Sequence, residues 1–291
     1  MDYSKLSIVR PPEIDSTWSP EDRLGALRVR LSIGRNRYRV NPGLYRLGSP
    51  GSDSEVFVTA NYKLSFDMLR KNLSGLSAWI LVLETYGINV WCAAGKGTFG
   101  SDELIRQLNN SRLSLYVSHR RLILPQLGAP GVSAQKVKEA TGYLVKFGPV
   151  RAEDIKAYIS AGYRKDELSR TVQFKIKDRL ILTGVEVAHS FWYLIIAIIL
   201  FALLSGIHSE GYSLALIWKE GLRAGLYLLA AYLSGAFLAP LLLPFLPFRH
   251  FGGKGMVSGL LVFALIAILG KLDLPLLSLL AWFLISGAIS S

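Results

Sequence analysis

Cysteine is almost absent from this sequence, since Cys92 is the only one among 291 residues. A single cysteine excludes an internal disulfide, and it excludes a [4Fe–4S] cluster held by this chain alone, because such clusters take several thiolate ligands. This cysteine usage fits a reducing compartment. It leaves one thiol whose role has to be inferred from the residues around it.

Acidic residues are fewer than basic ones, and neither kind is spread evenly. Residues 1–180 hold 28 basic and 17 acidic side chains, whereas residues 181–291 hold only 5 and 4. The sequence therefore predicts a basic soluble part followed by a membrane part. Residues 1–21 are polar and contain proline, so we expect no signal peptide and a soluble part that lies inside the cell.

Long uncharged runs fill the second part, and roughly 20 apolar residues of helix suffice to cross a bilayer. We expect four spanning helices, within residues 187–209, 224–248, 255–270 and 274–291. These four runs contain no charged residue, which favours an anchor over a transporter of ions. The sequence ends within the last run, so we expect a missing C-terminal segment.

Basic residues flank the predicted spans on one side. Six precede the first span and two separate the second from the third: Arg164, Lys165, Arg170, Lys175, Lys177, Arg179, Arg249 and Lys254. The positive-inside rule therefore predicts a multi-pass protein of the cytoplasmic membrane with its soluble domain in the cytoplasm. Membrane lipid is accordingly an expected partner.

Apolar residues at every second position from Leu27 to Ile33 alternate with arginine and serine, and Gly34-Arg35-Asn36 follows. This pattern predicts a basic β-hairpin within an N-terminal extension, residues 1–50. Its arginines suit a solvated strand face or contact with anionic lipid headgroups. They belong to no nucleic-acid recognition module, so we expect no nucleic-acid partner.

Strand-like and helix-like runs then alternate over residues 51–180. We expect strands within 55–60, 78–83, 122–124 and 143–147, and helices within 65–73, 101–108, 133–140 and 152–159. This order predicts a Rossmann-like α/β domain with a mainly parallel sheet, followed by an all-α transmembrane domain over residues 181–291. Ligands bind such sheets at the carboxyl ends of the strands, here in the loops at 59–64, 85–99, 125–132 and 148–151.

The loop at 85–99 is longer than most strand-to-helix connections, which take about 2–6 residues. It is not a P-loop, because that motif requires glycine at Val90 and serine or threonine at Gly97. The dinucleotide-binding fingerprint also fails, because no acidic residue stands at the end of the next strand. The extra length nevertheless indicates a functional loop.

Within this loop, Asn89 is expected to cap a short helix over residues 90–94 that Gly95 ends. Cys92 then lies in the first turn, where backbone N–H groups favour a thiolate, and Lys96 adds a positive charge. A thiolate is the form of cysteine that binds metals. The alternative for a lone cysteine is a small buried side chain with a structural role.

The run Asn89-Val90-Trp91-Cys92-Ala93-Ala94-Gly95-Lys96 resembles the cap-helix motif N-(V/I)-W-C-(A/G)-(A/G)-G-K of the HgcA family of mercury-methylating proteins, and all eight positions match. The resemblance implies a corrinoid-binding domain related to that of the corrinoid iron–sulfur protein. The family's plan of an α/β domain followed by membrane helices covers the whole chain. The family has a fifth span that this sequence lacks.

The resemblance implies a cobalamin-type corrinoid across the strand ends, with Cys92 as the catalytic residue and the lower axial ligand of cobalt. The cofactor-binding residues expected on this basis are Thr59, Asn89, Val90, Trp91, Cys92, Ala93, Ala94, Gly95, Lys96, Gln126, Leu127, Gly148, Pro149 and Val150. Thr59 is expected near the axial sulfur, and the turns at 126–129 and 148–150 at the nucleotide tail of the corrinoid. Ligation by histidine is excluded, because the motif D-x-H-x-x-G is absent.

Side-chain size and shape in this motif have a physical rationale. A flat macrocycle approaches a helix only where side chains are short, as at Ala93, Ala94 and Gly95. Trp91 is expected either beneath the ring or in the protein core.

By resemblance, the protein transfers a methyl group from methylcobalt(III) to Hg(II), delivered as a thiolate complex, and so produces methylmercury. A thiolate trans to the methyl group donates electron density to cobalt, which suits transfer to an electrophile. The implied partners are a ferredoxin-like [4Fe–4S] electron donor and a folate-type methyl donor or its methyltransferase. Two alternatives stay open: a membrane-tethered corrinoid methyl carrier in one-carbon metabolism with no mercury role, and a membrane scaffold without a cofactor.

Overall fold

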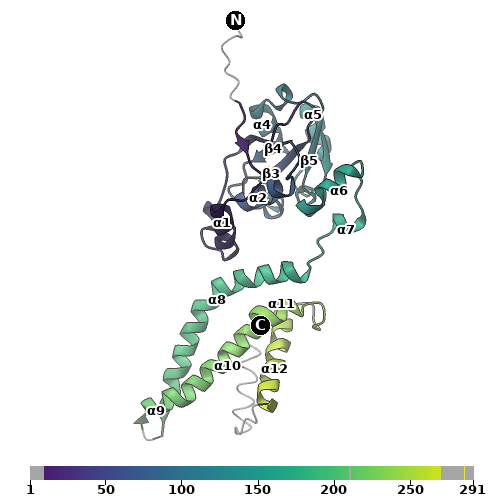
Figure 1. The fold of residues 1–291 in the computed structure, drawn as a ribbon. Helices are drawn as coiled ribbons and strands as arrows, with labels where there is room; N and C mark the ends of the chain where they lie inside the picture. The colour runs from purple at the N-terminus through teal and green to yellow at the C-terminus, as the bar shows by residue number, and fades with distance from the viewer. Residues whose placement is uncertain (1–9, 210, 270–284, 286–291) are drawn as a thin grey trace. The chain divides into compact units, whose positions relative to one another are not determined.

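The computed structural model describes residues 10–209, 211–269 and 285 (Figure 1). Contacts divide this chain into two units, with the boundary between Gln173 and Phe174. The first unit is an α/β domain and the second is helical. The boundary falls a few residues before the change in composition at residue 180.

A six-stranded sheet forms the centre of the first unit, in the order β1-β2-β4-β3-β5-β6. Its strands are β1 (Glu13–Ile14), β2 (Gly43–Leu47), β3 (Val56–Ala60), β4 (Ala78–Leu83), β5 (Arg121–Leu124) and β6 (Leu144–Phe147). Strands β4, β3, β5 and β6 are parallel, whereas β2 runs antiparallel to β4. The prediction of a mainly parallel sheet is confirmed, and β1 and β2 add an edge that was not predicted.

Helices cover both faces of this sheet (Figure 1). Helices α4 (Ser101–Ser111) and α5 (Ala134–Thr141) contribute Leu104 and Val137 to one core, together with strand residues such as Leu81 and Leu122. Helices α2 (Lys63–Asn72) and α6 (Ile155–Ser160) form the other core. Strands β3 and β4 are therefore buried on both sides, which accounts for their continuous apolar sequences.

Short helical turns complete the first unit. They are η2 (Arg35–Arg37), η3 (Leu113–Leu115), η5 (Ala152–Asp154) and α7 (Glu167–Arg170).

Helix α1 (Pro20–Arg30) covers the first residues of the predicted β-hairpin and η2 covers part of its predicted turn, so that prediction is wrong. Ser19 N donates to Asp22 Oδ2 at 3.0 Å, and Asp22 N donates to Ser19 Oγ at 3.1 Å. This reciprocal cap, with proline at the first helical position, is a strong helix start. The residues that α1 buries, Ala26 and Val29, lie three positions apart, which is a helical spacing rather than a strand alternation.

Strand β2, which lies within the predicted extension, is hydrogen-bonded to β4 inside the sheet.

A buried cluster of ion pairs between side chains connects α1 to α2. The Asp67 carboxylate is fully buried and accepts from Arg70 Nε at 2.8 Å and Lys63 Nζ at 2.7 Å. Asp22 pairs with the same two cations. Burial opposes ionisation of Asp22, but hydrogen bonds from Lys63, the Ser19 N–H and Arg70 outweigh it and lower the Asp22 pKa to about 2. The positive charges of this cluster are thus compensated.

The second unit contains α8 (Ile176–Leu204), a continuous helical stretch and α12 (Phe251–Leu269). The stretch comprises α9 (Leu214–Leu216), η6 (Ile217–Gly221), α10 (Leu222–Leu233), η7 (Ser234–Leu238) and α11 (Ala239–Leu241). A short ladder of β7 (Ile207–His208) and β8 (Gly211–Tyr212) follows α8.

Two helices of the described chain are long and apolar enough to cross a membrane, Leu214–Leu241 and Phe251–Leu269. A third span results if the segments Ile176–Val185 and Ser190–Leu204, which meet at 60°, are counted as one. The predicted fourth span, residues 274–291, lies outside the described residues except for residue 285.

The helix Leu214–Leu241 begins ten residues before the predicted second span. Its first turns therefore include Lys219, Glu220 and Arg223, which precede the uncharged run that begins at Ala224.

Candidate functional site

The carboxyl ends of the four parallel strands lie at one edge of the sheet. The loops that follow β4, β5 and β6 hold all but one of the predicted site residues, and Thr59 lies within β3. In the sheet, β3 lies between β4 and β5. The chain passes from β3 to its neighbour β4 and then crosses to β5 on the other side of β3, so the order in which strands are added to the sheet changes direction between β3 and β5. Such a switch point is where open α/β sheets bind their ligands.

Cys92 lies on α3 (Val90–Gly95), the short helix predicted within the long loop. Asn89 caps it as predicted, because its Oδ1 accepts a hydrogen bond from Cys92 N at 2.9 Å. Lys96 N closes the helix on Cys92 O at 3.0 Å. The Cys92 side chain is exposed, so the alternative of a buried structural cysteine is wrong.

Burial divides α3 into two sides. Val90, Ala93 and Ala94 are buried in the core beside α4, whereas Trp91, Cys92, Gly95 and Lys96 are exposed. Trp91 is 65% exposed, which excludes the core position that was one of its two expected roles. The thiol of Cys92 and the indole of Trp91 are therefore both accessible from outside the core.

The two alanines have a different role from the predicted one. Ala93 and Ala94 face the core, so their small size does not open the exposed side of α3 to a flat ligand. Both pack in the core, and a Cβ on Gly131 would lie 3.1 Å from Ala94 Cα and 2.2 Å from Phe99 O. The loop after β5 thus approaches α3 through a glycine.

Gly95 does lie on the open side of the helix. A Cβ built on Gly95 would meet no atom within 4 Å, and its backbone is in an ordinary conformation. Of the three small residues of the motif, Gly95 is the one that leaves room for a ligand beside Cys92.

Asn61, which was not among the predicted site residues, fixes the start of the Cys92 loop. Its side chain is 1% exposed, and its Oδ1 accepts from Thr85 N at 3.1 Å and from Gly87 N at 2.9 Å. Its Nδ2 donates to Glu84 Oε1 at 2.7 Å. The feature of the sequence that could have identified Asn61 is its amide side chain, which comes directly after a strand-like, mostly apolar run.

Tyr86, between these partners, adopts a left-handed backbone with φ 58°. Its N–H donates to Glu84 Oε1 at 2.7 Å. A non-glycine residue holds this conformation only where its surroundings over-determine it. The Asn61 and Glu84 hydrogen bonds supply that constraint, and they set the path of the chain toward α3.

Thr59 lies at the last-but-one position of β3 and is buried. Successive side chains of a strand point to opposite faces, and Val58 and Ala60 belong to the core that holds Val90 and Ala93. Thr59 and the buried side of α3 therefore lie on opposite faces of the sheet.

The two predicted tail-binding turns are joined by Lys165, which was not among the predicted site residues. Gln126 and Leu127 lie on η4 (Gln126–Gly128), and Gly148 and Pro149 are buried after β6, followed by Val150. Lys165 Nζ donates to Gln126 Oε1 and, at 3.2 Å, to Gly148 O.

No group of three or more histidine, cysteine, aspartate or glutamate side chains in the described chain is arranged to hold a metal ion. A metal bound at Cys92 therefore needs further ligands from outside these residues.

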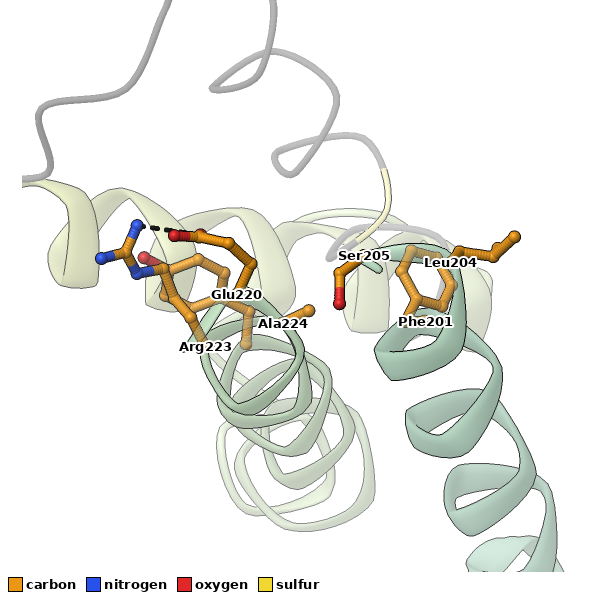
Figure 2. A pocket seen from close by; sticks show the side chains of 7 residues that line it. Phe201, Leu204, Ser205, Glu220, Arg223 and Ala224 are labelled. Carbon is orange, nitrogen blue, oxygen red and sulfur yellow. Dashed lines mark hydrogen bonds and ion pairs between the residues drawn. The ribbon is translucent and has the colours of Figure 1, made fainter. Parts of the chain in front are cut away.

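A separate pocket of about 340 Å³ lies in the second unit (Figure 2). It is lined by Phe201, Leu204, Ser205, Glu220, Arg223, Ala224 and Tyr227. Figure 2 shows Glu220 and Arg223 as an ion pair, with 3.2 Å between Glu220 Oε2 and Arg223 Nη1. The charges in this pocket therefore compensate each other, and no predicted site residue lines it.

Replacement Asn61→Ala is expected to loosen the Cys92 loop, because it leaves the buried N–H groups of Thr85 and Gly87 without their acceptor. Each orphaned group costs about 1–3 kcal/mol. Hydrogen–deuterium exchange of the full chain should show faster exchange in peptides covering residues 84–95.

The matched control is Asn72→Ala, since the exposed Asn72 side chain donates only to Met68 O within its own helix. Equal exchange in the two variants would contradict the assigned role of Asn61.

The sequence of this α/β unit is similar to those of known proteins. Residues 26–159 match the family described as CO dehydrogenase/acetyl-CoA synthase delta subunit, and this stretch contains every predicted cofactor-binding residue. The gamma subunit of the acetyl-CoA decarbonylase/synthase complex of Archaeoglobus fulgidus is 30% identical over 135 residues, which are 46% of this chain and 28% of that relative.

The gamma subunit of Methanopyrus kandleri is 28% identical over 127 residues, 43% of this chain and 27% of the relative. The large subunit of the corrinoid/iron–sulfur protein of Moorella thermoacetica is 28% identical over 125 residues, 42% of this chain and 28% of the relative. The chain thus spans less than a third of the length of these relatives. Its α/β unit is homologous to subunits of acetyl-CoA decarbonylase/synthase complexes and to the corrinoid/iron–sulfur protein large subunit.

Proposed function

We propose that this protein is a membrane-tethered corrinoid protein that carries a methyl group on cobalt, with Cys92 as the lower axial ligand. One observation carries the proposal: an exposed cysteine in the first turn of a capped helix, at the ligand-binding edge of a sheet. The homology to a corrinoid/iron–sulfur protein supports the choice of cofactor. The apolar helices of the second unit support the membrane tether.

The residues around Cys92 fit a flat cofactor. The thiol is exposed, Gly95 leaves open space beside it, and the indole of Trp91 is exposed on the same helix. A bound corrinoid supplies a cobalt ion that accepts and releases a methyl group. Asn89 Oδ1 holds the Cys92 backbone by accepting the Cys92 N–H, and a Cys92 thiolate would donate electron density to the metal.

The identity of the methyl acceptor is the finer part of the proposal. The complete Asn89–Lys96 motif favours Hg(II), supplied as a thiolate complex. A strongly donating thiolate ligand suits transfer of the methyl group to an electrophile such as Hg(II). A ferredoxin-like [4Fe–4S] protein would supply electrons, since one cysteine cannot hold such a cluster, and a folate-type donor or its methyltransferase would supply the methyl group.

The second candidate is a methyl carrier in one-carbon metabolism with no mercury role. The relatives favour this candidate, because their names place them in acetyl-CoA decarbonylase/synthase complexes. Both candidates use the same cofactor and the same cysteine, and they differ in the acceptor.

The visible spectrum of the purified full chain tests the cofactor assignment. Wild type is expected to bind a corrinoid with a thiolate-ligated absorption spectrum, and Cys92→Ala is expected to lose that spectral form. Cys92→His, which offers a nitrogen ligand, should give a third spectrum. A wild-type protein that binds no corrinoid, or a spectrum that Cys92→Ala leaves unchanged, contradicts the proposal.

Replacement Gly95→Leu tests the position of the ring. The new side chain meets no protein atom at its Cβ, so the fold should persist while corrinoid affinity falls by about 10-fold or more, the effect expected of a steric clash of at least 1.4 kcal/mol. The matched control is Gly51→Leu, another glycine whose added Cβ meets nothing within 4 Å. Equal corrinoid affinities of the two variants would place the ring elsewhere.

Methylmercury formation separates the two acceptors. Membranes containing the protein, the electron donor and the methyl donor are supplied with isotopically labelled Hg(II) as a thiolate complex, and labelled methylmercury is measured by mass spectrometry. Wild type is expected to form it and Cys92→Ala is not. A protein that binds corrinoid and takes up methyl groups but forms no methylmercury is the one-carbon carrier instead.

A further inference from the structure

Lys165 lies between the loops that follow β5 and β6, at the carboxyl edge of the sheet. The segment that carries it is fixed by neighbouring hydrogen bonds: Val150 N donates to Ser169 O at 2.9 Å, and Asp166 Oδ1 accepts from Ser169 N at 2.8 Å. The Lys165 ammonium is therefore held in place and bridges the loops by donating to Gln126 Oε1 and Gly148 O.

The charge of Lys165 is not compensated. Both of its acceptors are neutral, and no carboxylate in the described part of the chain lies within ion-pair distance of its Nζ. Burial and the nearby positive charge of Arg170 both lower the pKa of Lys165.

Lys63, in the same unit, has a charge that is compensated by two carboxylates. Burial lowers its pKa, but hydrogen bonds to Asp22 and Asp67 outweigh that effect and raise it overall. A partly buried cation without a counter-charge is costly, and binding an anion removes that cost. The ammonium also has three N–H donors, of which two are used, so one remains for an anionic oxygen.

We propose that Lys165, with Arg170 as a second positive charge, binds the phosphodiester in the nucleotide tail of the corrinoid, an inference that rests on the proposed function. Cobalt has one lower axial position, and if Cys92 occupies it, the base of the tail cannot. The tail then hangs free of the metal and has to be held by the protein.

The position of Lys165 relative to α3 suits this role. Helix α3 packs against η4, and Gln126 of η4 contacts Lys165. The anion site is thus one structural element away from the helix that carries Cys92. The ring and its tail would be held by adjacent parts of one sheet edge.

A pair of corrinoids tests the proposal. Cobalamin carries the phosphodiester tail, whereas cobinamide has the same ring but lacks the phosphate, ribose and base. Dissociation constants of both are measured by absorbance titration of the purified full chain, for wild type, Lys165→Gln, Lys165→Arg and Lys156→Gln. Lys156, an exposed lysine on α6, is the matched control.

Lys165 is expected to strengthen the binding of cobalamin by about 10-fold or more, as one charge-assisted hydrogen bond supplies, and to leave the binding of cobinamide unaffected. Lys165→Gln should therefore lose that affinity for cobalamin alone, whereas Lys165→Arg and Lys156→Gln should keep it. An affinity for cobalamin that Lys165→Gln leaves unchanged, or an equal loss for both corrinoids in that variant, would overturn the assignment of Lys165. Binding of neither corrinoid by wild type would instead overturn the proposed function.

Discussion

The exposure of Cys92 depends on the anchoring of one six-residue helix. A helix this short is not stable by itself, because nucleation is costly and few hydrogen bonds follow. Helix α3 is held by the Asn89 cap at one end and by Val90, Ala93 and Ala94 along its buried side. The apolar core thus stabilises the helix, while the opposite side of the helix is left free to bind a ligand.

The backbone around α3 is shaped by contacts with distant residues. Asn61 and Glu84 set the entry of the loop, and Gly131 lets the next loop come close to Ala94. These contacts join the ends of β3, β4 and β5. The site is consequently a property of the sheet edge as a whole and not of the eight-residue motif alone.

Charge compensation distinguishes the parts of the protein that hold the fold from those that are available to ligands. Lys63 and Arg70 are paired with Asp22 and Asp67, so the cluster between α1 and α2 is complete. In the second unit, Glu220 and Arg223 compensate each other in the same way. The Lys165 ammonium donates to two neutral acceptors and has no carboxylate partner in the described part of the chain, which is why the anion site is assigned to it.

Local signals in the sequence sufficed to predict much of this structure. Strand β4 has the predicted bounds, and α3 was predicted from its cap and terminal glycine. The β-hairpin was wrong because the alternation after Leu27 was given more weight than the helix start at Ser19-Pro20-Glu21-Asp22. Asn61 and Lys165 could not be found in this way, because their partners lie far along the chain, as Thr85 does 24 residues from Asn61 and Gln126 does 39 residues from Lys165.

The central claim is a bond between the sulfur of Cys92 and cobalt. X-ray absorption at the cobalt edge of the corrinoid-loaded full chain measures the atoms bound to the metal directly. The account predicts one sulfur neighbour in wild type and none in Cys92→Ala. A cobalt ion surrounded only by nitrogen and oxygen in the wild-type protein would contradict it.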